Sequence, residues 1–227
     1  MTAALCLHGQ PRFFRQTYKY FFSHLIKSLD CETYFHTWWT PEMVGSIYPC
    51  AKHAKASLDD ADMIVKEDTQ DELRRLYKPV DDCFDDYNVL PVHQRKSNYY
   101  QYYTQWIAGQ LLRKRYDLVI RARFDLMCTQ DIHIEQDDNV WVASCCPYTY
   151  DGTGRFNDMF SISNHDNFLR LSETYLNLPY FEAEGKGEME WALAKQAAKE
   201  RLSIKTFPAT YDRFDVLRSE SAKAYPI

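Results

Sequence analysis

Residues 116–128 read YDLVIRARFDLMC, and this stretch sets the expected centre of the fold. Its short apolar run predicts a central β-strand, and three charged side chains, Arg121, Arg123 and Asp125, come directly behind that run. A second short apolar run follows them. A strand that ends in such a cluster either fixes its own end with an internal Arg–Asp ion pair or presents the charges to a ligand.

The segments around this strand alternate between strand and helix patterns. Further strands are expected at 2–7, 31–37, 132–134, 141–144 and 160–163. Helices are expected at 13–29, 69–77, 97–115, 187–201 and from a cap at Ser163 to about 176, with an irregular stretch at 79–93. The alternation predicts one α/β domain over residues 1–227, with a mainly parallel sheet covered by helices on both faces.

The composition argues against two classes of partner. A net charge of −5 is unlike the basic excess that general nucleic-acid or anionic-membrane binding needs. No run approaches the roughly 18 apolar residues of an integral membrane segment, and the N-terminus has no signal-peptide pattern, so we expect a cytoplasmic protein. The 17 tyrosines suit polar ligands such as sugars and bases, and they equally suit a tyrosine-lined core.

Polar clusters follow three of the expected strands. HGQPR comes after the first strand, HTWW closes the second, and the arginines and aspartate end the central one. Ligands of open α/β sheets collect at the carboxyl ends of parallel strands, so these clusters predict a site there. Arginine forks fit phosphate oxygens, and a carboxylate suits magnesium or manganese. Arg12 of GQPR would bring a further cation to the same place.

Several motifs, in this order along most of the chain, resemble one family. They are LCLHGQPRFF, YFHTWW, YDLVIRARFDL, FNDMFSIS and a late helix that opens with an acidic residue. The resemblance is to the small glycosyltransferases of bacterial polysaccharide clusters and large DNA viruses, including WavE-like lipopolysaccharide-synthesis proteins. It implies a glycosyltransferase-A fold with a mixed, mainly parallel sheet flanked by helices. It also implies sugar transfer from a nucleotide-diphosphate donor to a glycan hydroxyl acceptor, often with Mn²⁺ or Mg²⁺.

The resemblance assigns a donor site to the first and central strands. The family's Asp-x-Asp motif corresponds here to Arg123-Phe124-Asp125, so Asp125 is the expected metal ligand. Arginine in the first position departs from that motif and leaves the need for metal open, because Arg121 and Arg123 could neutralise part of the diphosphate unaided. The turn after the first strand corresponds to the donor-binding loop. Its expected nucleotide contacts are His8, Gly9, Gln10, Pro11 and Arg12.

Three more residues match positions that line the sugar pocket or activate the acceptor. Asn157 and Asp158 open the FSIS strand, where the fold lines the sugar pocket, and Asp158 is a candidate catalytic carboxylate. Glu188 begins the last long helix, where inverting members carry the base. Each has an alternative: Asp158 can bond a turn, and Glu188 favours a helix N-terminus through the dipole.

Four aromatic residues are candidates for contacts with donor or acceptor. Trp38 and Trp39 follow the second strand, and Tyr99 and Trp106 lie at helical spacing in the helix before the central strand. For all four, packing in the core is the alternative.

Two other classes of function remain open at this stage. A phosphate-loop transferase such as a sulfotransferase would also place a phosphate site after the first strand, although HGQPRFF lacks the glycine-rich turn and the Lys-Ser/Thr ending. A non-catalytic carbohydrate-binding or assembly protein would keep the tyrosines and have no need of Asp125.

We predict that the seven cysteines are all reduced thiols in the native protein. Their number is odd and no C-x-x-C spacing occurs, so they fit neither a disulfide scaffold nor a recognisable zinc motif. Alkylation without reductant, followed by mass spectrometry, measures this directly. A stable internal disulfide would contradict both this prediction and the expected cytoplasmic location.

Overall fold

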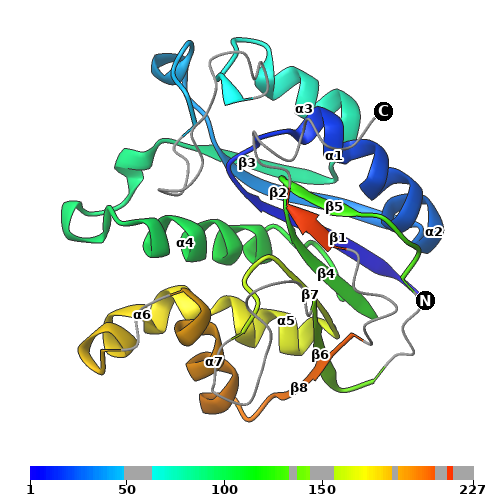
Figure 1. Cartoon of the computed structure of the whole chain (residues 1–227), viewed down its shortest axis with the longest axis vertical. Coiled ribbons are helices and arrows are strands. Elements are labelled where there is room, and N and C mark those ends of the chain that lie inside the picture. The colour runs from blue at the N-terminus through cyan, green and yellow to red at the C-terminus, as the bar shows by residue number, and fades with distance from the viewer. Residues whose placement is uncertain (49–62, 133–136, 144–155, 186–188, 208–213, 217–227) are drawn as a thin grey trace.

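The computed structural model describes residues 1–48, 63–132, 137–143, 156–185, 189–207 and 214–216. Within these residues the chain forms a seven-stranded sheet in the order β3-β2-β1-β4-β7-β6-β8, in which β7 alone runs antiparallel to the others (Figure 1). Its strands are β1 (Ala3–Gly9), β2 (Cys31–Trp38), β3 (Asp81–Asp85), β4 (Leu118–Arg123), β6 (Asn139–Val142), β7 (Phe160–Ser163) and β8 (Ser203–Thr206). The mixed, mainly parallel α/β class is thereby confirmed.

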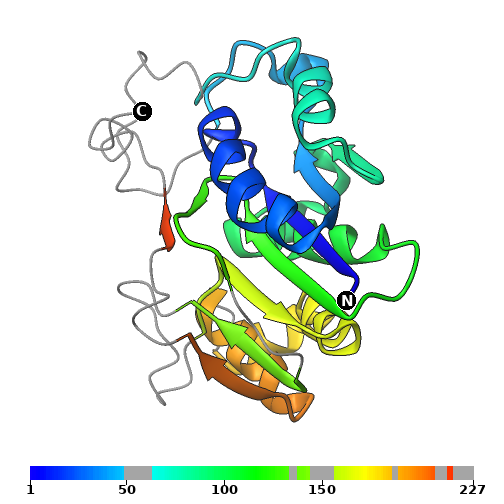
Figure 2. The ribbon, with the colours of Figure 1, turned by 90° about the vertical axis from the view of Figure 1, so that its right-hand side faces the viewer.

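Helices cover both faces of this sheet (Figures 1 and 2). One face carries α1 (Phe14–Phe21), a π-helical turn (Phe22–Ile26), α2 (Lys27–Leu29) and α3 (Thr69–Tyr77). The other carries α4 (Ser97–Gln110), α5 (His165–Ser172), α6 (Thr174–Ala183) and α7 (Met189–Lys199). A second, two-stranded sheet pairs β5 (Leu126–Cys128) with β9 (Phe214–Val216) in antiparallel fashion.

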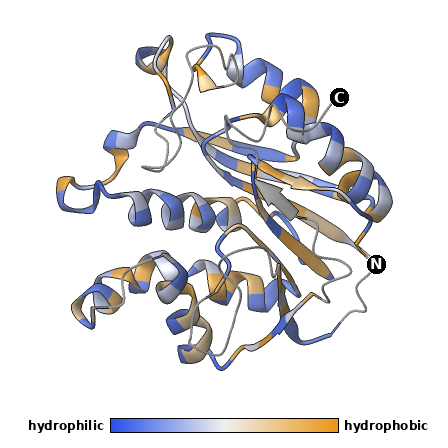
Figure 3. Cartoon of the chain, viewed as in Figure 1, coloured by the Kyte–Doolittle hydropathy of each residue, from blue (hydrophilic) through white to orange (hydrophobic). Residues whose placement is uncertain are grey.

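The two-residue period of β1 divides its side chains between these faces. Leu5 and Leu7 pack in the core shared with α1 and α3, whereas Ala4 and Cys6 pack with Ala108 of α4. His8 continues the Ala4–Cys6 row. By the same alternation Arg121 and Arg123 follow Val119, which packs in the α4-side core. The polar ends of β1 and β4 therefore lie on the face that α4 covers; α4 and the sheet are labelled in Figure 1 and coloured by hydropathy in Figure 3.

The chain changes direction across the sheet at β1. From β1 it moves through α1 to β2 and then through α3 to β3, whereas α4 carries it back over the opposite face to β4, on the other side of β1. The crossovers beside β1 thus leave the sheet on opposite faces. In open α/β sheets, ligands bind at such a switch point, outside the carboxyl ends of the two strands, which here are Gly9 and Arg123.

Several expected elements are confirmed and others are wrong. Helix 13–29 is a continuous helical run over 14–29, helix 69–77 is α3, and strand 160–163 is β7. Helix 97–115 ends earlier, at Gln110, and the strand expected at 141–144 is β6, at Asn139–Val142. The strand expected at 132–134 lies mostly outside the described residues. The single domain over 1–227 stays a prediction.

The missed elements carry weak local signals. Strand β3, placed in the supposedly irregular 79–93, has the sequence DDCFD, and its five residues are all half-buried at the sheet's edge. Acidic residues are poor strand formers, so only pairing with β2 identifies it. Helix α6 was missed because Pro179 interrupts its pattern, and the α5 cap is Asn164, not Ser163. No helix among the described residues has the length and apolar character to cross a bilayer.

Phe124, at the turn between β4 and β5, is the test of this packing. Its side chain is fully buried, and its ring lies 5.6 Å from Phe35 and 5.8 Å from Tyr77, centroid to centroid. Phe124→Ala should lower the free energy of unfolding by about 3–5 kcal/mol, because it leaves a cavity under the strand end. Urea unfolding measures this. Phe22→Ala, at a ring that is 43% exposed, is the control and should cost clearly less; equal losses would contradict the packing described.

Candidate active site at the ends of β1 and β4

Asp125 is the centre of the polar cluster at this end of the sheet. Its carboxylate is 2% exposed and accepts hydrogen bonds from two arginines. Arg123 donates from Nε to Oδ1 at 2.9 Å and from Nη2 to Oδ2 at 2.6 Å, and Arg12 donates from Nη2 to Oδ2 at 2.6 Å. The turn at 124–125 folds Asp125 back onto Arg123, and the loop after β1 brings Arg12 to the same carboxylate.

The electrostatics of this cluster favour an anion. Burial by itself raises the pKa of Asp125, but the charges and hydrogen bonds of Arg123 and Arg12 outweigh it and hold the pKa below its ordinary value. Asp125 is therefore ionised, and one negative charge faces two positive ones. The side chains of Arg12 and Arg123 are 15% and 20% exposed, so the excess positive charge is open to solvent.

The loop between β1 and α1 has a constrained backbone. Gly9 has φ +93°, and a Cβ there would meet no atom within 4 Å, so this backbone borders open space. The carbonyl of Gly9 accepts from Thr37 Oγ1 at 2.7 Å, and Gln10 Nε2 donates to Tyr87 Oη at 3.0 Å. Phe13, at φ 55°, is also left-handed and leads into α1. These constraints fix the path that returns Arg12 to Asp125.

His8 is buried beside this cluster without a hydrogen bond. It is 1% exposed, lies opposite Arg123 of β4 and His36 of β2 in the strand register, and neither ring nitrogen has a partner within the described chain. Burial, followed by the charges of Arg121 and Arg123, holds the pKa of His8 well below its ordinary value. His8 is thus a neutral imidazole with an unused lone pair.

Unsatisfied polar atoms concentrate around His8. Of the nine buried side-chain nitrogen and oxygen atoms without a hydrogen bond in the described residues, six belong to this end of the sheet and the helix above it. They are His8 Nδ1 and Nε2, Gln10 Oε1, Arg12 Nε, His36 Nδ1 and Gln105 Nε2. Native proteins leave few buried polar groups unpaired, so this concentration indicates a place that a ligand or water completes.

Arg121 does not belong to the exposed part of the cluster. It is 2% exposed and donates from Nε to Ser161 Oγ at 3.0 Å, from Nη1 to Gln105 Oε1 at 2.9 Å and from Nη2 to the Asn157 carbonyl at 3.1 Å. Burial lowers the pKa of Arg121 to about 10. In this structure its guanidinium joins β4, α4, β7 and the segment before β7, and the expected donor contact of Arg121 stays a prediction.

The expected sugar-pocket residues lie in that same segment. Asn157 is fully buried, and its Oδ1 accepts from the Met159 amide at 2.9 Å, which shapes the turn before β7. Asp158 is 6% exposed and accepts from Gln101 Nε2 of α4, and its charge acts on Arg121. Asn157 thus has a turn-forming role here, and Asp158 joins α4 to this turn. Glu188 lies outside the described residues.

Trp38, the last residue of β2, packs in the core. Trp38 is 1% exposed and stacks on Tyr87 and Tyr103, with centroids 4.9 and 5.5 Å apart. Trp39 donates its indole N–H to the Lys66 carbonyl at 3.0 Å. For Trp38 the packing alternative holds, and a position at the cleft mouth is wrong.

Tyr99 and Trp106 of α4 are likewise used for packing. Tyr99 is 2% exposed and donates its hydroxyl to Glu182 at 3.0 Å, and Trp106 stacks on Tyr175 at 5.3 Å. The tyrosine-lined core that the composition left open is therefore present on the α4 side, where these rings share one cluster.

The sequence missed one buried polar group beside the site. His36 Nε2 lies 3.0 Å from Asp85 Oδ2, and Tyr103 donates its hydroxyl to the same oxygen at 2.9 Å. The hydrogen bond from His36 holds the pKa of Asp85 below its ordinary value, so the carboxylate is ionised. The sequence placed Asp85 in an irregular stretch, because β3 was not recognised. HTWW did mark His36 as near a strand end.

The contacts of Asp125 fit a divalent cation poorly. Mn²⁺ and Mg²⁺ take several oxygen ligands, usually including carboxylates. Both oxygens of Asp125 instead accept from guanidinium groups, and two positive charges occupy the positions where further ligands would be needed. Among the described residues, Asp125 belongs to no group of three or more histidine, cysteine or carboxylate side chains that are close enough together to share a metal ion. The donor set therefore does not support the expected metal role of Asp125.

Comparison with known proteins finds similarity in structure and none in sequence families. Two structures of the glycosyltransferase GlyE from Streptococcus pneumoniae TIGR4 are similar to this chain. One is 15% identical over 93% of this chain with a TM-score of 0.48, and the apo form is 16% identical over 92% with a TM-score of 0.47. The chain covers 46% of either GlyE chain. No family model and no curated protein matches it.

Asp125→Asn should destabilise the chain in a pH-dependent way. The substitution leaves two partly buried guanidinium groups without their anion, which costs about 3–5 kcal/mol. Because the pKa of Asp125 is lowered in the folded state, its contribution is present above the ordinary carboxyl pKa and is lost as the pH falls through the folded value. The difference in unfolding free energy between parent and variant should therefore be larger at pH 7 than at pH 3.

Urea unfolding at both pH values measures this difference. Asp166→Asn is the matched control, because it breaks an Arg–Asp pair whose side chains are 55% and 70% exposed. It should change stability little at either pH. A pH-independent loss in Asp125→Asn would show that packing, and not the charge, explains its effect.

Proposed function

We propose that this chain is a glycosyltransferase that moves a sugar from a nucleotide-diphosphate donor to a hydroxyl group of a glycan acceptor. The observation that carries the proposal is the arrangement of Arg12, Arg123 and Asp125 at the switch point of the sheet. A diphosphate is negatively charged and would balance the net positive charge of this cluster. The proposed class is the small polysaccharide and lipopolysaccharide glycosyltransferases of glycosyltransferase-A fold that the motifs resemble.

The donor's diphosphate lies, in this proposal, against the exposed sides of Arg12 and Arg123. Asp125 holds both guanidinium groups in place before the ligand arrives, so little side-chain freedom is lost on binding. Gly9 borders open space and gives a ligand close access to the backbone of the loop. The unpaired Gln10 Oε1 and the neutral His8 supply further polar contacts beside the phosphate site.

The chemistry proposed is electrostatic support of the leaving group. As the glycosidic bond breaks, negative charge grows on the nucleotide diphosphate, and preorganised donors aimed at that charge lower the barrier. Arg12 and Arg123 supply the donors without a cation at Asp125. Asp158 is the described candidate for the carboxylate that helps the acceptor hydroxyl attack, and Glu188 keeps that role as a prediction from the resemblance.

The two other classes of function make different predictions for the same cluster. A non-catalytic carbohydrate-binding protein would bind a sugar or sugar nucleotide and never cleave it. A sulfotransferase would prefer a nucleotide that carries a 3′-phosphate and a sulfate. A thermal-shift screen of nucleotide sugars and sulfonucleotides, with and without manganese, followed by donor hydrolysis assays on the hits, separates the three. Binding of a sugar nucleotide without turnover, with any acceptor mixture tested, would contradict a transferase.

Arg12→Ala should weaken binding of a nucleoside diphosphate roughly tenfold to a hundredfold. A charge-assisted hydrogen bond is worth about 1.5–3 kcal/mol, and each 1.4 kcal/mol is about a factor of ten in affinity. Asp125 keeps its two bonds to Arg123, so the fold should survive. Calorimetric titration of UDP and GDP into parent and variant measures the change.

Arg74→Ala removes the same charge from α3, where Arg74 pairs with Asp82, and serves as the control. It should leave diphosphate affinity unchanged apart from a small long-range effect that salt screens. If Arg12→Ala behaved like this control, GQPR would be an ordinary surface turn and the proposed donor site would be lost.

A further inference from the structure

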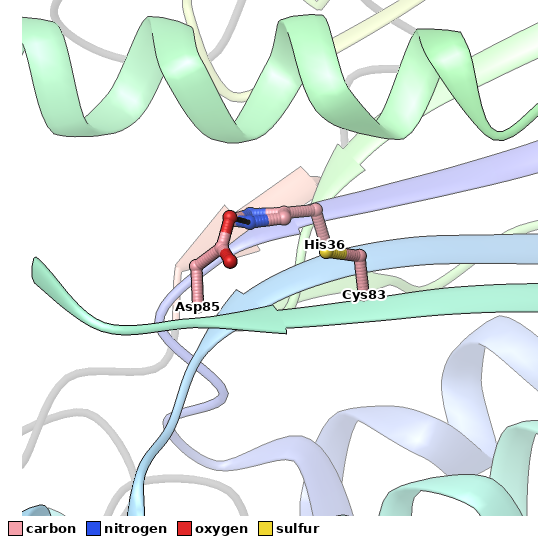
Figure 4. A group of neighbouring side chains, drawn as sticks. All are labelled: His36, Cys83 and Asp85. Carbon is pink, nitrogen blue, oxygen red and sulfur yellow. Dashed lines mark hydrogen bonds and ion pairs between the residues drawn. The ribbon is translucent and has the colours of Figure 1, made fainter. Parts of the chain in front are cut away.

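Three side chains of different chemistry meet at the ends of β2 and β3. One ligand atom each from His36, Cys83 and Asp85 lies within 4.8 Å of the other two (Figure 4). His36 pairs with Cys83 in the register of the two strands, and Asp85 is two residues further along β3, so all three lie on the α4 face. His36 is 47 positions from Cys83 and 49 from Asp85 in the sequence, which explains why no cysteine spacing indicated the group.

The group already has features of a metal site. Asp85 is oriented by the Tyr103 hydroxyl, which donates to Oδ2 at 2.9 Å, as outer groups orient metal-binding carboxylates. The Cys83 thiol makes no hydrogen bond in the described part of the chain and is half-buried. Asp85 is 25% exposed, so solvent reaches one of the three groups, whereas His36 is buried.

His36 can change its protonated nitrogen without breaking any other contact. Since Asp85 is ionised and can only accept, the hydrogen bond of 3.0 Å requires the proton on Nε2 of His36. Nδ1 is buried and has no partner in the described residues, so nothing there opposes the other tautomer. A cation that replaced the shared proton would leave the ring proton on Nδ1.

We propose that His36, Cys83 and Asp85 bind a divalent transition metal of the Zn²⁺ or Co²⁺ kind. Imidazole nitrogen and thiolate sulfur select such borderline ions over Mg²⁺ and Mn²⁺, which prefer oxygen ligands alone. Three protein ligands leave the fourth tetrahedral position to water or to a ligand atom. The site is separate from the Asp125 cluster and does not rest on the proposed glycosyl transfer.

The dimensions require small adjustments. Tetrahedral zinc with bonds of about 2.0–2.2 Å to nitrogen and oxygen and about 2.3 Å to sulfur places its ligand atoms roughly 3.3–3.6 Å apart. The distance between His36 Nε2 and Asp85 Oδ2 needs to increase slightly from 3.0 Å. The Cys83 sulfur, which lies within 4.8 Å of the other two ligand atoms, needs to move closer to them. Rotation of the Cys83 side chain about χ1 is the movement available to the sulfur. The thiol must lose its proton, so binding releases a proton to the buffer.

Cobalt titration of the purified, chelator-treated full chain tests the site. Co²⁺ bound by a thiolate gives a sulfur-to-metal charge-transfer band in the near ultraviolet, and tetrahedral coordination gives strong visible bands. We expect both at one equivalent, their loss on adding Zn²⁺, and no effect of excess Mg²⁺. Absence of the charge-transfer band in the parent protein would overturn the proposal.

Matched variants assign the ligands. Cys83→Ser should abolish the charge-transfer band, whereas Cys31→Ser, at a half-buried thiol on the same sheet, should keep it. His36→Gln and Asp85→Asn should each weaken Co²⁺ binding at least about tenfold. Circular dichroism checks that each variant is folded, and Asp85→Asn, at the most exposed ligand, provides the test if His36→Gln does not fold. A band that survives in Cys83→Ser would contradict the site.

The Arg12→Ala variant tests whether the metal site is independent of the proposed donor site. It should bind Co²⁺ like the parent, because Arg12 contacts Asp125 and none of the three proposed ligands. Loss of diphosphate affinity with intact cobalt binding would support both proposals independently. Loss of the cobalt bands in a folded Arg12→Ala would instead show that the metal site depends on the Asp125 cluster, which would overturn a separate site at β2 and β3.

Discussion

A carboxylate that is 2% exposed cannot remain ionised unless positive charge and hydrogen bonds replace the water it has lost, and Asp125 obtains both from Arg12 and Arg123. The two arginines come from parts of the chain more than 100 residues apart. Their shared carboxylate therefore joins the loop after β1 to the end of β4. Thr17 of α1 strengthens the same junction, since its hydroxyl donates to the Phe124 carbonyl at 2.6 Å.

This junction fixes geometry more than it adds stability. Buried ion pairs recover little net free energy, because desolvation of the charges offsets their attraction, whereas removal of one partner is costly. The cluster consequently specifies one arrangement of the strand ends and keeps a net positive charge there. The unpaired atoms of His8, Gln10 and Arg12 lie beside it. Because no group in the described part of the protein uses their hydrogen-bonding capacity, it stays available to a ligand.

The sequence predicted the class of the sheet, because the hydrophobic period distinguishes strands from helices. It also predicted that Arg12, Arg123 and Asp125 lie close together, because the carboxyl ends of neighbouring parallel strands lie at the same edge of a sheet. It could not predict whether Asp125 faces a cation or arginines, since the two arrangements share one local pattern. The role of Asp85 was missed for a related reason. Strand β3 is recognisable only through its pairing with β2. The hydrophobic pattern of a sequence predicts which face of a strand a residue lies on, but it does not predict the hydrogen-bond partners of that residue.

Arg121 and Arg123 differ in burial and in contacts, which the two-residue alternation of a strand does not predict. Two residues apart, both point to the α4 face, and local sequence gives them equal standing. Arg121 lies opposite Cys6 in the middle of β1, under α4, where Ser161 and Gln105 absorb its donors. Arg123 lies two residues further along, opposite His8 near the end of β1, and its side chain is 20% exposed. The position of each arginine along the strand therefore decides its environment. Arg121 is buried and joins parts of the fold, whereas Arg123 is partly exposed and accessible to a ligand.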